Sequence, residues 1–273
     1  MRREPIRVLV SGYLGKMGAT VAAAVAAAPD MVLAGGYDPG RAEKCVRSAE
    51  GEPLAPAFTS LEAALEATEP QVMVEFTLPD VAAFNLQTAL LGGVDCVLGT
   101  SGVPTQTLDR LANEAPSGTA LFYAPNYTTG AVLMMAASKL AAGFFDDVEI
   151  IEFHHNNKKD APSGTAIATA EMLEAARSAE QIRSSAPGAE TELSGFSGAR
   201  GAELGASGIR LHALRSNGFV ASQEVIFGST GQRLTIRHDS FDRTSYMPGV
   251  LLAIRRVGAL SGLVIGLEEL MQL

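Results

Sequence analysis

Short apolar runs alternate with helical segments through the first half of the chain. The run Ile6–Val10 leads into a glycine-rich segment, and an alanine-rich stretch over residues 19–28 then predicts a helix. This alternation continues to residue 126. Further strands are expected over 31–38, 71–77, 94–102 (running into a glycine loop) and 120–126, with helices over 81–91 and 105–114. Strands that alternate with helices predict a parallel sheet covered on both faces.

The pattern changes after residue 126. A buried helix is expected over 130–145, a strand over 147–152 and a helix over 166–177. The next apolar runs have few helices between them, which predicts an antiparallel or mixed sheet of α+β type. These runs cover 208–215, 221–227 and 233–239, and residues 244–273 then return to apolar helix, at 248–256 and 266–271. A length of 273 residues fits two domains.

Residues 178–207 have no clear periodicity and are rich in Ser, Gly, Ala and Glu. They predict a long loop, and loops of this length are usually functional or mobile. Within this loop, Gly198–Gly201 is a candidate second contact for an anion.

The first strand, turn and helix have the arrangement of a dinucleotide-binding unit. Gly12 would make the turn, Gly15 would admit a pyrophosphate, and Gly18 would permit close packing of the helix. Asp38 ends the second strand, where a carboxylate would hold the ribose hydroxyls of an adenosine. The alternative is an ordinary βαβ unit in which the Asp is structural.

Ligands of parallel sheets bind outside the carboxyl ends of the strands. The strand ends of the first half are therefore candidate nicotinamide contacts, although ordinary loop residues would fit the same positions. Cofactor contacts are expected at Gly12, Gly15, Lys16, Met17, Gly18, Asp38, Phe76, Thr77, Gly99, Thr100, Ser101, Ala124, Pro125 and Asn126.

The segment from Glu152 to Ala166, EFHHNNKKDAPSGTA, carries the most distinctive chemistry. It joins a strand to a helix, where binding residues are commonly mounted. His154 and Lys158 are candidate acids, and the helix start at 163–165 (Ser-Gly-Thr) suits a carboxylate or phosphate. The alternative is a turn with a helix cap and solvated lysines. Adjacent histidines lack the spacing of a metal site, so no metal is expected.

Composition narrows the class of protein. The net charge of −9 and the absence of a basic patch argue against nucleic acid as a partner. Only Cys45 and Cys96 occur, which implies no disulfide framework and favours a reducing compartment. No apolar run is long enough to span a membrane, and no signal peptide precedes the first strand. We therefore expect a cytoplasmic protein that does not bind membranes.

The two sites together resemble those of the 4-hydroxy-tetrahydrodipicolinate (dihydrodipicolinate) reductase family of bacterial lysine and diaminopimelate synthesis. The most specific match is the segment 152–166. Supporting matches are 75–77, 99–102, 124–126 and 198–201, and residues 234–245 are similar to the actinobacterial branch. Pro39 departs from the Arg that members using NADPH often place after the acidic residue.

This resemblance implies that NADH or NADPH delivers hydride to C4 of the hydroxylated ring of a small dicarboxylate as water is lost. It implies catalytic roles for His154 and Lys158. Substrate contacts are implied at His155, Gly164 and Thr165, with Ser163 in the same helix start. It also implies a Rossmann-type domain over 1–127, completed by 244–273, and a substrate-binding domain over 128–243 that forms a homotetramer. Two alternatives stay open: a nicotinamide-dependent dehydrogenase of another small amino or keto acid, and a non-catalytic nucleotide-binding sensor.

Overall fold

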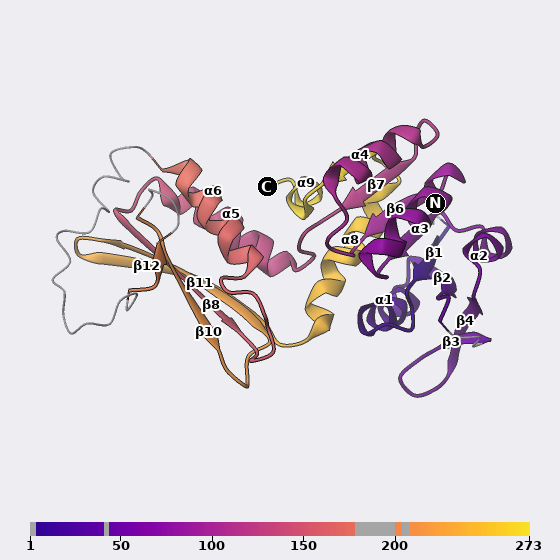
Figure 1. The fold of residues 1–273 in the computed structure, drawn as a ribbon, viewed down its shortest axis with the longest axis horizontal. Coiled ribbons are helices and arrows are strands. Elements are labelled where there is room, and N and C mark those ends of the chain that lie inside the picture. The colour runs from indigo at the N-terminus through magenta and orange to yellow at the C-terminus, as the bar shows by residue number, and fades with distance from the viewer. Residues whose placement is uncertain (1–3, 41–43, 178–199, 204–207) are drawn as a thin grey trace. The chain divides into compact units, whose positions relative to one another are not determined.

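The structure is a computed structural model that describes residues 4–40, 44–177, 200–203 and 208–273. The chain divides into two compact units, coloured along the sequence in Figure 1. Unit 1 comprises Met1–Tyr127 and Tyr246–Leu273, and unit 2 comprises Thr128–Ser245. The chain thus leaves unit 1 after Tyr127 and returns to it at Tyr246.

Unit 1 is built on an eight-stranded sheet in the order β13-β7-β6-β5-β1-β2-β4-β3. Neighbouring strands are parallel except β3 and β4, which pair antiparallel at the edge. The strands are β1 (Ile6–Ser11), β2 (Met31–Tyr37), β3 (Cys45–Arg47), β4 (Pro53–Phe58), β5 (Val72–Glu75), β6 (Asp95–Leu98), β7 (Ala120–Tyr123) and β13 (Gly262–Ile265). The Rossmann-type parallel sheet predicted from the sequence is therefore confirmed.

Helices cover this sheet in two layers. The helices are α1 (Lys16–Ala27), α2 (Leu61–Thr68), α3 (Pro79–Leu91), α4 (Thr105–Glu114), α8 (Met247–Val257) and α9 (Leu267–Met271). The alanine-rich α1 packs with α8, whereas α2, α3 and α4 share a core with the sheet. Each of these three helices contributes a leucine to that core: Leu61 from α2, Leu86 from α3 and Leu108 from α4. Local signals set several helix starts: the Ser60 hydroxyl accepts from the Ala63 N–H, and Pro79 opens α3.

The elements of unit 1 differ from those predicted from the sequence in two places. No element was predicted between Asp38 and residue 71, so β3, β4 and α2 were missed. Prolines 53 and 56 obscure the strand pattern of β4, whereas α2 follows an ordinary helix signal, the Ser60 cap. Within 244–273 the sequence predicted helices at 248–256 and 266–271, which correspond to α8 and α9, but no strand was expected between them. Residues Gly262–Ile265 form β13, which pairs parallel with β7. A four-residue apolar run carries no periodicity that separates strand from helix, so its pairing partner decides its conformation.

Unit 2 contains a five-stranded mixed sheet in the order β12-β11-β8-β10-β9. Strands β8 and β10 are parallel, and the other pairs are antiparallel. Its elements are α5 (Thr129–Ala142), β8 (Asp147–His154), α6 (Gly164–Ala176), β9 (Ala202–Glu203), β10 (Arg210–Arg215), β11 (Ala221–Ser229), β12 (Gln232–Ser240) and the 3-10 helix η1 (Arg243–Tyr246). Helices α5 and α6 lie on one face, as Figure 1 shows. The expected α+β architecture with a mixed sheet is confirmed.

Between helices and sheet lies the core of unit 2, which includes Val148, Ile150 and Phe227. Most of the predicted loop 178–207 and Arg41 lie outside the described residues. Of the candidate anion contact 198–201, only Arg200 and Gly201 are described. No helix among the described residues combines the length and apolar character needed to cross a membrane.

Candidate active site

Strand β8 carries an alternating pattern that ends in polar residues. Val148 and Ile150 face the helices, and period-two alternation places Glu152 and His154 on the same face. The Glu152 side chain is fully buried, and the His154 side chain is 15% exposed. The apolar face of the strand therefore continues into a carboxylate and an imidazole at the end of the sheet.

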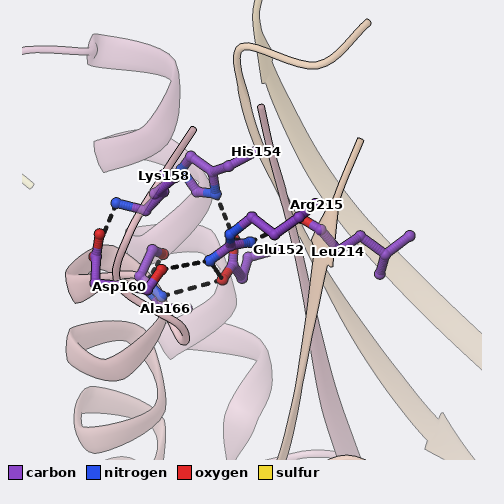
Figure 2. A network of polar contacts seen from close by, with 8 residues as sticks. Glu152, His154, Lys158, Asp160, Ala166, Leu214 and Arg215 are labelled. Carbon is purple, nitrogen blue, oxygen red and sulfur yellow. Dashed lines mark hydrogen bonds and ion pairs between the residues drawn. The ribbon is translucent and has the colours of Figure 1, made fainter. Parts of the chain in front are cut away.

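Figure 2 shows the contacts around Glu152. Its Oε1 accepts a hydrogen bond from the Ser163 backbone N–H at 3.1 Å and one from Arg215 Nη2 at 2.8 Å. Its Oε2 accepts from Arg215 Nη1 at 2.9 Å and contacts His154 Nδ1. One carboxylate thus joins β8, β10 and the start of α6. No role was predicted from the sequence for either Glu152 or Arg215.

These contacts determine the protonation of the pair. Burial raises the pKa of the Glu152 carboxyl, but the hydrogen bonds from Arg215 and His154 lower it by more, and the net pKa lies below its ordinary value. Burial lowers the pKa of His154, and the hydrogen bond and charge of Glu152 offset this only in part. The lowered pKa favours a neutral imidazole at pH 7, and in that form a proton on Nδ1 would face the carboxylate and leave a lone pair on Nε2.

The loop after β8 holds the second candidate acid. Lys158 Nζ lies 2.9 Å from Asp160 Oδ2, and the lysine side chain is 22% exposed. This ion pair lowers the pKa of Asp160. The positive charge of Lys158 is thus partly compensated, which composition alone did not predict. His155 and Lys159 are exposed.

Helix α6 begins as expected at the Ser-Gly-Thr segment. The Ser163 hydroxyl accepts from the Ala166 N–H at 3.2 Å, so this buried side chain caps the helix. A Cβ placed on Gly164 would meet no atom within 4 Å, which leaves open space beside the first helical residue. Thr165 follows, and its carbonyl accepts from the Thr169 hydroxyl at 2.7 Å. The helix start therefore combines a cap with an open approach to the backbone, which is the geometry of an anion site.

In unit 1 the glycine-rich turn between β1 and α1 is tightly built. Gly12 has φ +81°, and a Cβ there would lie 2.8 Å from the Phe76 carbonyl oxygen. A Cβ on Gly18 would lie 2.0 Å from the Gly12 carbonyl oxygen. Helix α1 starts at Lys16 without a side-chain cap from Gly15. Its first N–H groups are therefore not covered by a capping side chain, as a pyrophosphate site requires.

The sheet order brings the other predicted cofactor residues to one edge. Strands β7, β6, β5, β1 and β2 are consecutive neighbours, and each candidate segment follows the carboxyl end of one of them. The segments are Gly12–Gly18 after β1, Asp38 after β2, Phe76–Thr77 after β5, Gly99–Ser101 after β6 and Ala124–Asn126 after β7. Asp38 Oδ1 accepts from the Gly40 N–H at 2.9 Å, so this carboxylate also has a structural contact.

A second buried carboxylate, Glu75, links these strand ends. Its Oε2 accepts from the Ser11 hydroxyl at 2.6 Å and from the Asn85 amide at 3.0 Å, and its Oε1 accepts from the Thr77 N–H at 2.7 Å. The Thr100 hydroxyl donates to the Thr77 carbonyl at 3.0 Å. Glu75 therefore fixes the Phe76–Thr77 segment, a role that the sequence reading did not assign.

Within the described part of the chain, no group of three or more His, Cys, Asp or Glu side chains could hold a metal ion. The carboxylates beside His154 and Lys158 are instead paired with cations, Glu152 with Arg215 and Asp160 with Lys158. The site therefore offers an imidazole, an ammonium group and a helix start.

Comparison with known families covers nearly the whole chain. The family described as "Dihydrodipicolinate reductase, N-terminus" matches residues 6–127, and "Dihydrodipicolinate reductase, C-terminus" matches residues 130–271. A 4-hydroxy-tetrahydrodipicolinate reductase of Enterococcus faecalis is 44% identical, covering 97% of this chain and 100% of that protein. One from Mycolicibacterium smegmatis is 41% identical, covering 98% and 100%. Since these two identities are similar, they do not single out an actinobacterial branch.

A solved structure agrees with these sequence relatives. It is described as a dipicolinate-bound dihydrodipicolinate reductase from Paenisporosarcina sp. TG-14. It matches with a TM-score of 0.81 and 36% sequence identity, covering 97% of this chain and 99% of that one. Fold and sequence therefore point to the same relatives.

Proposed function

The chain belongs to the dihydrodipicolinate reductase family, and we infer that it reduces 4-hydroxy-tetrahydrodipicolinate to tetrahydrodipicolinate with NADH or NADPH. The observation that supports this inference is the intact segment 152–166 of unit 2, in which His154 contacts Glu152, Lys158 pairs with Asp160 and the helix start at Gly164 is open. The reaction consumes one hydride and one proton and releases water. A proton donor and an anion site are therefore both required.

Unit 1 has the features of the nicotinamide cofactor site. Gly12 and Gly18 allow a tight turn before the uncapped start of α1, where a pyrophosphate would bind. Asp38 would hold the adenosine ribose, and the strand-end segments 76–77, 99–101 and 124–126 would contact the nicotinamide. When bound, the dihydronicotinamide supplies the hydride.

Lys158 carries the ammonium group that would donate the proton. In the neutral form, the His154 Nδ1–H would donate a hydrogen bond to the Glu152 carboxylate, so that Nε2 would accept a hydrogen bond from the substrate or from the departing water. Asp160 holds the Lys158 ammonium in place at 2.9 Å. Both His154 and Lys158 were predicted from the sequence to be acids. The lowered pKa of His154 gives them different roles: Lys158 would donate the proton, and His154 would orient the substrate and accept a hydrogen bond.

The start of α6 is the proposed site for a substrate carboxylate. Gly164 leaves open space for close approach, and Thr165 would donate through its hydroxyl. The exposed His155 would add a further contact. The solved relative from Paenisporosarcina is described as binding dipicolinate, a dicarboxylate, which supports this assignment.

We also propose that the protein is a cytoplasmic homotetramer assembled through unit 2. The support is the resemblance to the family and the usage of cysteine: Cys45 and Cys96 are both unpaired, as expected in a reducing compartment. Measurement of the mass in solution by light scattering would test the tetramer, and a monomer would exclude it.

The test of the function is NADH oxidation on addition of freshly made dihydrodipicolinate-synthase product. We expect turnover by the wild type and a fall in kcat of about 10²–10⁴-fold in Lys158→Ala, as is typical for a general acid. His154→Gln should also lower kcat, while NADH binding stays normal in both variants. Lys159→Ala is the matched control for the loss of one lysine charge. The absence of turnover with either nicotinamide would exclude the reductase function, and wild-type-like rates in both variants would refute the assigned roles.

A further inference from the structure

The strongest unassigned feature is the set of four hydrogen bonds that the Arg215 guanidinium donates (Figure 2). Two go to the Glu152 carboxylate, at 2.8 and 2.9 Å. The other two go to the Asp160 and Leu214 carbonyls, both at 2.7 Å. Arg215 therefore clamps the carboxylate beside His154 and also ties down the loop that carries Lys158.

From this geometry we propose that Glu152 and Arg215 are positioning residues of the reductase: Glu152 fixes the Nδ1–H tautomer of His154, and Arg215 holds Glu152 and the Lys158 loop in place. The proposal rests on the reductase function inferred above for the roles of His154 and Lys158. Neither Glu152 nor Arg215 is assigned a contact with substrate or cofactor.

The strand register explains why this arrangement is specific. In the parallel pairing of β8 with β10, Arg215 lies opposite His154 and Ala213 lies opposite Glu152. The small Ala213 side chain leaves the guanidinium free to reach back to the Glu152 carboxylate. Because an arginine fork matches a carboxylate with two parallel bonds, it fixes the orientation of the carboxylate as well as its charge.

The donors around Glu152 explain why only a carboxylate serves at this position. Its two oxygens accept from the Ser163 N–H, both Arg215 nitrogens and the His154 ring. An amide in its place has one oxygen and one NH₂ group. If the oxygen keeps its bonds to Ser163 and Arg215 Nη2, the NH₂ group faces His154 Nδ1 and loses the bond from Arg215 Nη1. The imidazole must then move its proton to Nε2, which inverts the donor and acceptor that it presents to substrate.

The groups that face His154 come from three places. Glu152 lies on the same strand, Arg215 comes from β10, and Lys158 lies in the following loop. Glu152 is the anion among these three, and its contact with Nδ1 determines the tautomer. The two cations repel the protonated ring and so favour the neutral imidazole.

The experiment records ¹⁵N NMR spectra of the histidine side chains at neutral pH in the wild type and Glu152→Gln. Single His→Gln variants assign the four histidines. We expect an Nδ1–H tautomer for His154 in the wild type and an Nε2–H tautomer in Glu152→Gln. Loss of kcat by about 10-fold or more should accompany the switch, because a reacting histidine held in the wrong tautomer loses activity. The KM for NADH should not change.

Matched controls come from the pair Arg237–Glu224 in the same sheet, in which the arginine is exposed, the glutamate is half-buried, and the side-chain nitrogen and oxygen lie 3.1 Å apart. Glu224→Gln and Arg237→Lys should keep the wild-type tautomer and rate. Arg215→Lys keeps the charge but loses the fork, so its kcat should fall at least fivefold with an unchanged KM for NADH. This variant decides the matter if Glu152→Gln fails to fold.

Retention of the Nδ1–H tautomer in a folded Glu152→Gln protein would overturn the proposal, as would a wild-type kcat in Arg215→Lys. The tautomer measurement needs no turnover. If the wild type fails to oxidise NADH but His154 switches tautomer in Glu152→Gln, the reductase function falls while the role of Glu152 stands.

Discussion

The Asn85 amide nitrogen donates a hydrogen bond to the buried Glu75 carboxylate at 3.0 Å, whereas the Asn85 Oδ1 has no partner among the described residues. Glu75 also accepts from the Ser11 hydroxyl and the Thr77 N–H. A hydroxyl can reverse its role and an amide can rotate by 180°, so two of these three neighbours can serve either as donors or as acceptors.

This freedom predicts different costs for two substitutions at Glu75. In Glu75→Gln the new oxygen would accept from Thr77, and the new NH₂ group would donate to Ser11 and to a rotated Asn85 Oδ1. We expect the free energy of unfolding to stay within about 1 kcal/mol of the wild type. Glu75→Ala leaves buried donors without an acceptor, which costs about 1–3 kcal/mol for each group.

Urea unfolding and NADH titration would measure both variants. The Kd for NADH should rise in Glu75→Ala, because the Phe76–Thr77 segment loses its anchor. Glu114→Ala provides a control for an exposed carboxylate, paired with Arg110 at 3.0 Å. Equal stability losses in Glu75→Gln and Glu75→Ala would mean that Asn85 does not rotate and that the carboxylate charge itself is needed.

Much of the fold could be predicted from the sequence, because its periodic segments are long enough. Helix α4 was predicted at its observed bounds, Thr105–Glu114, since leucines at helical spacing mark one buried face. By contrast, β13 is four residues long and is a strand only because β7 lies beside it. The partner of a short segment comes from tertiary structure, which local patterns do not record.

The candidate site also combines a feature that local sequence spacing predicts with one that depends on tertiary structure. Glu152 and His154 are two residues apart on a strand, and that spacing alone places them on one face. Arg215 is 63 residues further along the chain than Glu152 and reaches it through the register of β8 with β10. The register between distant strands cannot be predicted from local sequence patterns. The motif 152–166 therefore included Glu152 but gave no indication that Arg215 is its partner.

Two substitutions at the start of α6 should separate its cap from its anion site. Ser163→Ala removes the acceptor of the Ala166 N–H and should lower the free energy of unfolding by about 0.5–2 kcal/mol. Thr165→Val should leave stability nearly unchanged but raise the substrate KM, because a lost hydrogen bond to a charged group costs about 1.5–3 kcal/mol.

Thermal unfolding and steady-state kinetics on both variants would check this, with the KM for NADH as the internal control. The substrate KM in Thr165→Val decides between the two readings of this segment. If it is unchanged in a folded protein, the start of α6 is only a helix cap.

Acid should destabilise the protein in two windows. The folded-state pKa of His154 is lowered, so the unfolded chain binds the proton first, and stability falls as pH drops below about 6.5. The pKa of Glu152 is also lowered. Its contribution is present above an unfolded pKa of about 4.3 and is lost as pH falls through the folded value.

Urea unfolding at pH values from 8 down to 4 would measure the first window. His154→Gln should flatten the dependence of stability on pH below about 6.5, and the exposed neighbour provides His155→Gln as a control. His238, whose pKa burial also lowers, should account for part of the slope that remains. A slope in His154→Gln equal to that of the wild type would contradict a neutral, buried imidazole at this site.

The enzyme should accept both cofactors, with NADH at least as good as NADPH. Asp38 follows β2, where its carboxylate can accept hydrogen bonds from the ribose 2′- and 3′-hydroxyls but would repel a 2′-phosphate. Pro39 offers neither a cation nor an N–H. Lys16 is exposed at the first position of α1 and can approach the phosphate, which offsets part of the repulsion. Arg41, which lies outside the described residues, would act in the same direction.

Values of kcat/KM for both cofactors at one salt concentration test this balance, and Lys16→Ala should lower the value for NADPH more than that for NADH. A tenfold or larger preference for NADPH, about 1.4 kcal/mol, would mean that Asp38 does not hold the ribose.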